Sequence, residues 1–202
     1  GTPLFPLMPY PRYARMSHED VEAIVAYVRT LPAVPAEPLP ARTLNFPLPL
    51  VVRTMPAAPS HQPRPPASDR VAYGEYLTNA AVCADCHTPI DDQGMPLSGM
   101  NFAGGMAFSP HGVGLVRSAN ITPDAGTGIG TWTEEQFVEK FRAFRGQPMR
   151  TLEGAERLQN TEMPWTYYAG MHDDDLGAIY AYLRSQRPVV NRVEKFGTPG
   201  QP

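Results

Sequence analysis

Two cysteines and a histidine stand together in the segment Cys83-Ala84-Asp85-Cys86-His87. The pattern Cys-x-x-Cys-His is the attachment site of c-type haem. Cysteines three positions apart lie about one helical turn apart, so both thiols can reach the two vinyl groups on one edge of a porphyrin. His87 then places an imidazole under the iron. The motif therefore predicts covalently bound haem c, with His87 as the proximal iron ligand.

Three other interpretations of the two cysteines fit the sequence less well. A thioredoxin-like redox pair needs a preceding strand in a βαβ unit, but residues 71–81 have a helical pattern and the chain after the motif is rich in glycine and proline. A structural zinc site needs a second Cys/His pair, whereas the chain has only two cysteines, and His61, His111 and His172 are scattered. A disulfide at this spacing would close too short a loop to stabilise much.

The iron needs a sixth ligand from another part of the chain, and a methionine thioether suits a high-potential electron carrier. Among nine methionines, Met163 is the first candidate, because Pro164 stiffens its backbone and Trp165 can cover the haem. The other candidates, in order, are Met100, Met106 and Met149, followed by His111 and His172.

Helices are expected on both sides of these ligands. One begins at Ser68 or Asp69 and leads into the motif, and a second runs from a capping box at Thr133 to Gly146. A third begins in the acidic turn 173–175, has apolar residues at helical spacing, and stops before Pro188. Residues 88–130 show no long periodicity, and a short strand pairing is weakly indicated at 113–116. The sequence thus predicts an all-α unit with a long irregular segment wrapped around a cofactor.

An internal repeat changes the interpretation of the N-terminus. Met8-Pro9-Tyr10 and the residues up to Arg29 recur without a gap 155 positions later, from Met163-Pro164-Trp165 to Arg184. We therefore expect residues 1–31 to be the C-terminal part of a truncated unit, 32–67 a proline-rich linker, and 68–202 a complete unit. The first unit has no cysteine motif of its own, and truncation explains this better than loss of a haem. Met8 would take the role of Met163 there.

Composition limits the remaining possibilities. A chain of 202 residues with 42% hydrophobic and 18% charged residues can bury one modest core or two small ones. A net charge of −3 does not favour nucleic acid. The longest apolar stretch, 44–52, is interrupted by prolines and far shorter than the roughly 20 residues of a membrane span. No signal peptide is visible, and a chain that opens on Gly1 fits a mature or trimmed product.

Residues from about Ser68 to Asn191 resemble a class I cytochrome c domain of the multihaem cytochromes (dihaem or trihaem) that serve periplasmic dehydrogenases and respiratory chains. The resemblance rests on the haem motif and on four further stretches: Asn120-Ile121-Thr122-Pro123-Asp124, Thr127-Gly128-Ile129-Gly130-Thr131-Trp132, Met163-Pro164-Trp165 and Ala178-Ile179-Tyr180-Ala181-Tyr182-Leu183-Arg184. It implies a cytochrome c-like helical domain around one covalent haem, with the iron held by His87 and Met163.

The resemblance also implies contacts around the haem. Polar contacts to the propionates are expected from Arg117, Asn120 and Trp132, although a capping or packing role is equally open for each. A backbone carbonyl after the motif, that of Pro89 or Pro96, is expected to accept a hydrogen bond from the second nitrogen of His87. The stretch 150–161 resembles an insertion relative to shorter relatives.

Two classes of function follow. In the first, the domain exchanges single electrons between redox partners, such as a periplasmic dehydrogenase or a membrane-associated complex. In the second, it belongs to a redox enzyme or sensor, such as a dihaem peroxidase, in which one iron keeps an open position. The Met-Pro pair favours the electron carrier. Covalent haem attachment requires an extracytoplasmic route, so the expected location is the periplasm or the outer face of a bacterial membrane. The donor and acceptor are not evident from the sequence.

Overall fold

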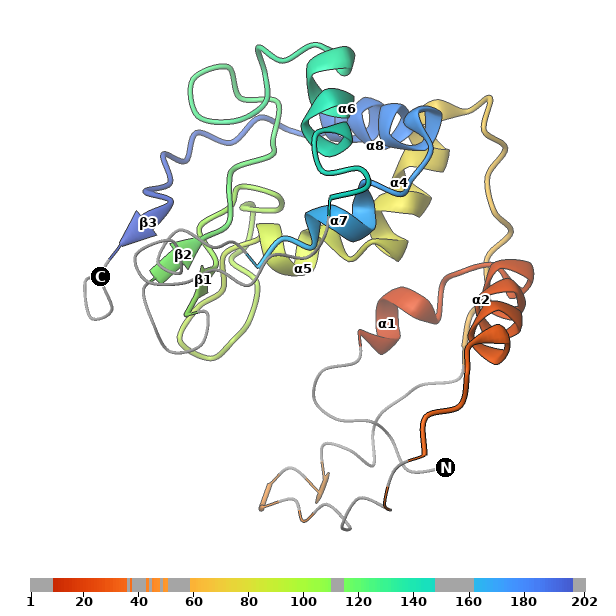
Figure 1. The fold of residues 1–202 in the computed structure, drawn as a ribbon. Helices are drawn as coiled ribbons and strands as arrows, with labels where there is room; N and C mark the ends of the chain where they lie inside the picture. Colours follow the sequence, from red (N-terminus) through yellow and green to blue (C-terminus); the bar gives the residue numbers. More distant parts are fainter. Residues whose placement is uncertain are drawn as a thin grey trace. The chain divides into compact units, whose positions relative to one another are not determined.

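The computed structural model describes residues 9–35, 37, 43, 45–47, 49–50, 59–109, 115–147 and 162–197. The chain divides into two compact units, a first unit of residues 1–64 and a second unit of residues 65–202 (Figure 1). Each unit is described by itself. In the described part of the chain, no helix has the length and apolar character needed to cross a membrane.

The second unit is mainly helical. Its helices are α4 (Arg70–Ala80), α5 (Cys83–His87), α6 (Glu134–Arg142), α7 (Trp165–Tyr168) and α8 (Asp173–Ser185). It also contains a small antiparallel sheet of β1 (Ala107–Phe108), β2 (Leu115–Arg117) and β3 (Phe196–Gly197), in the order β1-β2-β3. Ala107 lies opposite Arg117, and Leu115 lies opposite Gly197. The helical expectation is confirmed, whereas the strand after α8 was not foreseen, because two residues give no periodic signal.

The helix starts follow the capping residues in the sequence. Asp69 accepts a hydrogen bond from the backbone N–H of Ala72 at 3.1 Å and begins α4. At α6, the Thr133 hydroxyl accepts from the Gln136 N–H at 3.2 Å, and the Gln136 side chain accepts from the Thr133 N–H at 2.9 Å. This capping box confirms the predicted start of α6. The helix ends at Arg142, earlier than expected, and turns lead on to Gly146.

Helices α4 and α8 pack against each other at a close backbone approach. Gly74 of α4 is buried, and a Cβ atom there would collide with the carbonyl of Ala178 in α8. Tyr73 donates its hydroxyl to the Asp175 carboxylate at 2.9 Å near the same crossing. The glycine therefore sets the distance between the two helices.

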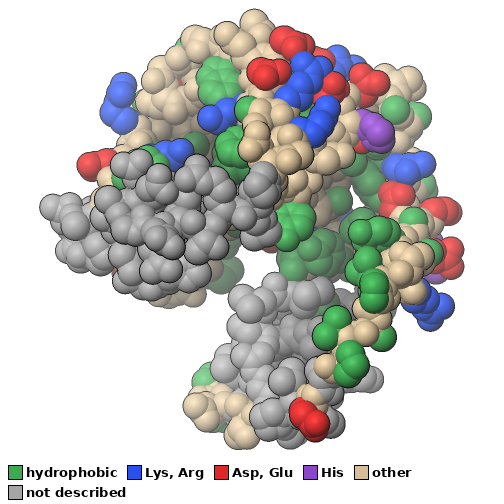
Figure 2. Space-filling model, viewed as in Figure 1, with side chains coloured by type: hydrophobic (Ala, Val, Ile, Leu, Met, Phe, Trp, Pro, Cys, Tyr) green, Lys and Arg blue, Asp and Glu red, His purple; other side chains and the backbone are tan. Residues whose placement is uncertain are grey.

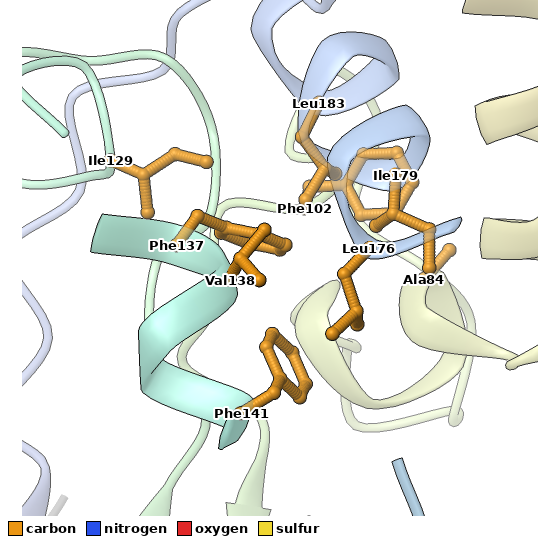
Figure 3. Packing of buried hydrophobic residues seen from close by; sticks show 9 residues of the cluster. All are labelled: Ala84, Phe102, Ile129, Phe137, Val138, Phe141, Leu176, Ile179 and Leu183. Atoms are coloured by element: carbon orange, nitrogen blue, oxygen red, sulfur yellow. The ribbon is translucent and has the colours of Figure 1, made fainter. Parts of the chain in front are cut away.

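The core of the second unit lies between α6 and α8. In Figure 3 the side chains on α6 and those on α8 point toward one another, with residues from α5 and two loops completing the cluster. The members of this cluster are Ala84, Phe102, Ile129, Phe137, Val138, Phe141, Leu176, Ile179 and Leu183. Cys83, Met163 and Trp165 pack against it. The haem motif thus borders the hydrophobic core.

The first unit repeats the last two helices of the second. Helix α1 (Tyr10–Tyr13) and helix α2 (His18–Thr30) have the same lengths as α7 and α8 and lie 155 positions earlier. Backbone angles agree as well, with φ/ψ of −77°/61° at Pro9 and −80°/64° at Pro164. The Ser17 hydroxyl accepts from the Asp20 N–H at 3.1 Å and begins α2. The sequence repeat is therefore also a repeat of local structure.

The matching apolar positions of the two long helices differ in burial. Ile179 and Leu183 of α8 are 5% and 1% exposed, whereas Ile24 and Val28 of α2 are 51% and 56% exposed. Over the whole of α2, which the structure describes in full, no residue is buried. The apolar face of α2 therefore has the residue spacing of a core helix, but its side chains are exposed.

The end of the proline-rich segment contacts the first unit. The Ser60 N–H donates to the Ala14 carbonyl at 3.0 Å, and His61 Nδ1 donates to the Met16 carbonyl at 2.7 Å. Arg64 forms an exposed ion pair with Asp20 at 3.1 Å. Residues 60–64 are thus packed on the first unit rather than extended throughout.

Candidate functional site

The second unit contains a cavity of about 460 Å³ between the α5 motif, α6 and α8. Cys83, Cys86 and His87 line it together with Met163, and the remaining wall is mostly aliphatic and aromatic. Its size is within the range of cavities that bind small molecules and cofactors. The sequence-predicted ligands from two distant segments therefore meet at one mainly apolar cavity.

The orientation of His87 is fixed by a hydrogen bond from its ring. Nδ1 lies 2.7 Å from the carbonyl oxygen of Ala119. Since a carbonyl only accepts, Nδ1 carries the proton and Nε2 keeps its lone pair for a metal. Burial lowers the pKa of His87, and the Ala119 carbonyl opposes this in part. The imidazole is therefore neutral at pH 7, as an iron ligand must be.

The acceptor of this hydrogen bond corrects the sequence expectation of Pro89 or Pro96. The Pro89 carbonyl instead accepts from the Leu97 N–H at 2.9 Å, within the loop after the motif. Ala119 lies 32 residues after His87 and follows β2. Sequence proximity was a poor guide, because the sheet returns the chain to the motif from much further along.

The two cysteines lie on the short helix α5 and are not joined by a disulfide. The turn between α4 and α5 is made at Val82, which has a left-handed φ of 51°. Burial, followed by the charges of Asp85 and Glu162, raises the pKa of Cys86. A protonated thiol is unlike the low-pKa thiolate of a redox-active cysteine pair. Among the residues that the structure describes, no three His, Cys, Asp or Glu side chains form a cluster that could hold a metal ion.

Among the residues that the structure describes, two methionines line the cavity, Met163 and Met171. Met163 lies two residues before α7, and the Tyr168 hydroxyl of this helix donates to the Ala81 carbonyl at 2.8 Å, close to the haem motif. Met171, which lies 155 positions after Met16 and so belongs to the internal repeat, was not among the ligands predicted from the sequence. The alternatives Met100, Met106 and His172 do not line the cavity. Three other sequence predictions lie outside the described residues: His111, Met149 with the stretch 150–161, and Met8.

No protein-family profile matches the chain. The cytochrome c subunit of gluconate 2-dehydrogenase from Pantoea cypripedii is 35% identical over 113 residues, which is 56% of this chain and 22% of the relative. The cytochrome subunit of fructose dehydrogenase from Gluconobacter japonicus is 35% identical over 155 residues, which is 75% of this chain and 29% of the relative. The chain carries a cytochrome c domain similar to those of dehydrogenase subunits.

A third relative is also a cytochrome c subunit of a dehydrogenase. The cytochrome c subunit of quinone-dependent alcohol dehydrogenase from Gluconobacter oxydans is 34% identical over 119 residues, which is 58% of this chain and 22% of the relative. The chain spans less than a third of the length of the relatives described here.

The three predicted propionate contacts of the cytochrome c domain all line the cavity. Arg117 donates to the Glu194 carbonyl at 3.3 Å beside β3. The carbonyl of Trp132 accepts from the Tyr180 hydroxyl at 2.6 Å, which fixes the Trp132 backbone. Asn120 differs, because its buried side-chain amide already donates to the Val189 carbonyl at 2.8 Å and to the Thr127 hydroxyl at 3.0 Å. A propionate would have to compete with these bonds.

Two lysines that sequence reasoning missed also line the cavity of the cytochrome c domain. Lys140 Nζ lies 5.6 Å from the centre of the Trp165 ring. The pKa of Lys195 is lowered by partial burial and by repulsion from Lys140. With Arg117 they place positive charge at a mostly apolar cavity, where the carboxylates of a haem would be neutralised. Neither lysine belongs to a motif, so only the fold could reveal them.

These residues fit haem c. The cavity wall is mostly apolar, both cysteines of the motif reach it, and a neutral imidazole and a thioether line it. Arg117, Lys140 and Lys195 line the cavity as well, and their charge is opposite to that of the two carboxylates of haem. The donor set is that of a c-type haem rather than of a hydrated metal ion.

Proposed function

We propose that the second unit is an electron-transfer domain that binds haem c through thioether bonds to Cys83 and Cys86. His87 and Met163 are its axial iron ligands. When bound, haem c supplies a one-electron ferric/ferrous couple. The observation that supports this proposal most directly is that the cysteine motif and Met163 line the same cavity.

The protein's own residues act by positioning and by excluding water. His87, whose ring bonds the Ala119 carbonyl, and Met163, which lies ahead of α7, would both bind the iron, so no iron site would remain for a substrate. The apolar wall lowers the local dielectric and keeps water from the iron. Arg117, Lys140 and Lys195 offset the negative charge of the propionates. This arrangement favours electron exchange over catalysis at the iron.

The partners are proposed from the names of the relatives, which are cytochrome subunits of gluconate, fructose and alcohol dehydrogenases. We infer that this domain accepts electrons from a dehydrogenase partner and passes them to a further redox protein in a membrane-associated complex. Covalent haem attachment places the chain in the periplasm or on the outer face of a bacterial membrane.

For the domain organisation we propose that residues 1–31 are the C-terminal part of a second cytochrome c-like unit, 32–67 a linker, and 68–202 a complete domain. Helices α1 and α2, which match α7 and α8 in length and in backbone angles, support this proposal. The exposed apolar face of α2 supports it as well, since the corresponding face of α8 is covered by α4 and α6.

The test is to express the chain with its haem assembled in a bacterial periplasm and to measure intact mass, absorption spectra and carbon monoxide binding. We expect one haem, a six-coordinate low-spin spectrum in both redox states, and no reaction with carbon monoxide. Replacement of both Cys83 and Cys86 by alanine should abolish covalent attachment. Rapid carbon monoxide binding or peroxide turnover by the native protein would instead support a peroxidase-like enzyme or a sensor.

A further inference from the structure

A buried polar cluster lies next to the Ala119 carbonyl that His87 Nδ1 bonds, and electron transfer itself does not require it. Asn120 is 5% exposed and is the centre of this cluster. Its amide nitrogen donates to the Val189 carbonyl at 2.8 Å, and its amide oxygen accepts from the Thr122 N–H at 2.9 Å and from the Thr122 hydroxyl at 2.7 Å. The side chain is thus saturated by the protein alone.

A second asparagine continues the cluster toward the loop after the motif. The backbone N–H of Asn191 donates to the Thr127 hydroxyl at 3.0 Å, and its side chain donates to the Ala103 carbonyl at 2.9 Å. Residues 189–191, which follow α8, are therefore hydrogen-bonded to two separate segments, 120–127 and 103.

The same two segments hold His87. The Ala119 carbonyl, next to Asn120, accepts from His87 Nδ1, and the N–H of Gly104, next to Ala103, donates to the His87 carbonyl at 2.7 Å. Gly104 has a left-handed φ of 73°, and a Cβ atom there would collide with the backbone of Ala119. The His87 ring and the His87 backbone are therefore hydrogen-bonded to two closely packed segments. Asn120 and Asn191 link these segments through residues 189–191.

We propose that Asn120 and Asn191 are positioning residues for the proximal ligand, which hold the Ala119 carbonyl against His87 and thereby lower the reduction potential of the haem. The proposal rests on the proposed function, because it needs haem iron on His87. A carbonyl that accepts from Nδ1 makes the imidazole a stronger electron donor and stabilises ferric over ferrous iron. A weaker hydrogen bond between the Ala119 carbonyl and His87 Nδ1 would remove part of this stabilisation of ferric iron.

The experiment measures the reduction potential of three variants in the haem-loaded chain: Asn120→Ala, Asn191→Ala and Gly104→Ala. We expect each to shift the equilibrium toward ferrous haem by up to about tenfold, which is about 59 mV for a one-electron couple. In the reduced, diamagnetic protein, the Nδ1 proton of His87 should exchange faster with solvent in each variant. The ferric near-red band of methionine ligation should persist, which excludes loss of Met163 as the cause.

Thr133→Ala is the matched control, because it removes the α6 capping box and costs about 1 kcal/mol of stability without touching the His87 segments. A potential shift of the same size in this control would overturn the proposal, because general destabilisation would then suffice. Unchanged potential and unchanged proton exchange in all haem-loaded variants would overturn it as well. If Asn120→Ala does not fold, the Asn191→Ala variant tests the proposal, because Asn191 is only half-buried. Absence of haem on the unmutated chain would contradict the proposed function itself, an outcome distinct from both.

Discussion

Met163 and Met171 both line the cavity that contains His87, and only one of them can be the axial ligand. Met163 precedes Pro164, the N-cap residue of α7, whereas Met171 lies in the turn between α7 and α8, and its carbonyl accepts from Arg145 at 3.1 Å. The sequence had favoured Met163 for the stiffness of the Met-Pro pair. Among the described residues, Met163 and Met171 are the two candidates, and a single experiment can separate them.

We expect Met163→Ala to lower the reduction potential, since the thioether favours ferrous iron, and to remove the ferric near-red band. Met171→Ala should leave both nearly unchanged and cost stability as a core truncation. Redox titration and absorption spectra of the two variants are the measurement. The reverse result would move the axial ligand to Met171.

At the scale of elements, the crossing of α4 and α8 depends on the absence of a side chain at Gly74. Replacing Gly74 by alanine would press a methyl group against the Ala178 backbone, so the helices must separate. We expect a loss of about 1 to 3 kcal/mol in the free energy of unfolding, despite the better helix propensity of alanine. Urea denaturation gives this value, with Glu75→Ala on the exposed face of α4 as the control. Equal stability of the two variants would show that the crossing tolerates a side chain.

The N-terminus of α8 is stabilised by ion pairs between Asp173 and two arginines. Asp173 bonds Arg142 at 2.6 Å and Arg145 at 2.9 Å, and Figure 2 shows acidic and basic side chains side by side at the α6–α8 end of the second unit. Arg142 and then Arg145 lower the pKa of Asp173 from 3.8 to about 2. Since the folded-state pKa is the lower one, this stabilisation is present above pH 4 and is lost as the pH falls toward 2.

The corresponding measurement is thermal unfolding of Asp173→Asn and of the unmutated chain between pH 2 and pH 7. We expect the variant to melt at a lower temperature at neutral pH and the difference to close near pH 2. Asp174→Asn shares the favourable position at the helix N-terminus but lacks the two arginines, so its difference should be smaller. A difference for Asp173→Asn that does not depend on pH would contradict the ion-pair explanation.

At the scale of the whole molecule, the repeat supplies a matched pair of mutations. Ile24 of α2 and Ile179 of α8 occupy the same repeat position, but they are 51% and 5% exposed. We expect Ile179→Ala to cost about 2 to 5 kcal/mol and Ile24→Ala to change stability by no more than about 0.5 kcal/mol. Denaturation of both variants in this chain checks the difference. A large cost for Ile24→Ala would mean that the α2 face is covered in solution.

Local sequence determined a large part of this protein. The cysteine motif, the caps at Asp69 and Thr133, the apolar spacing of α8 and the repeat of α1 and α2 each depend on residues near one another in the chain. Short-range hydrogen bonding and helical periodicity decide such features, so they can be predicted from the sequence without knowledge of the fold. Met163 is an intermediate case, favoured by its neighbours and brought to the cavity by the fold.

Only the tertiary structure decided which distant groups meet. The Ala119 carbonyl on His87, the polar cluster of Asn120 and Asn191, and the lysines at the cavity join segments from separate parts of the chain. Nothing in the local sequence marks them, because a backbone carbonyl has no residue identity and a surface lysine has no periodicity. The two-residue strands have the same origin, since pairing across the sheet rather than propensity forms them. The sequence thus predicted the haem site, and the packing of loops and sheet decided how the His87 side chain is held.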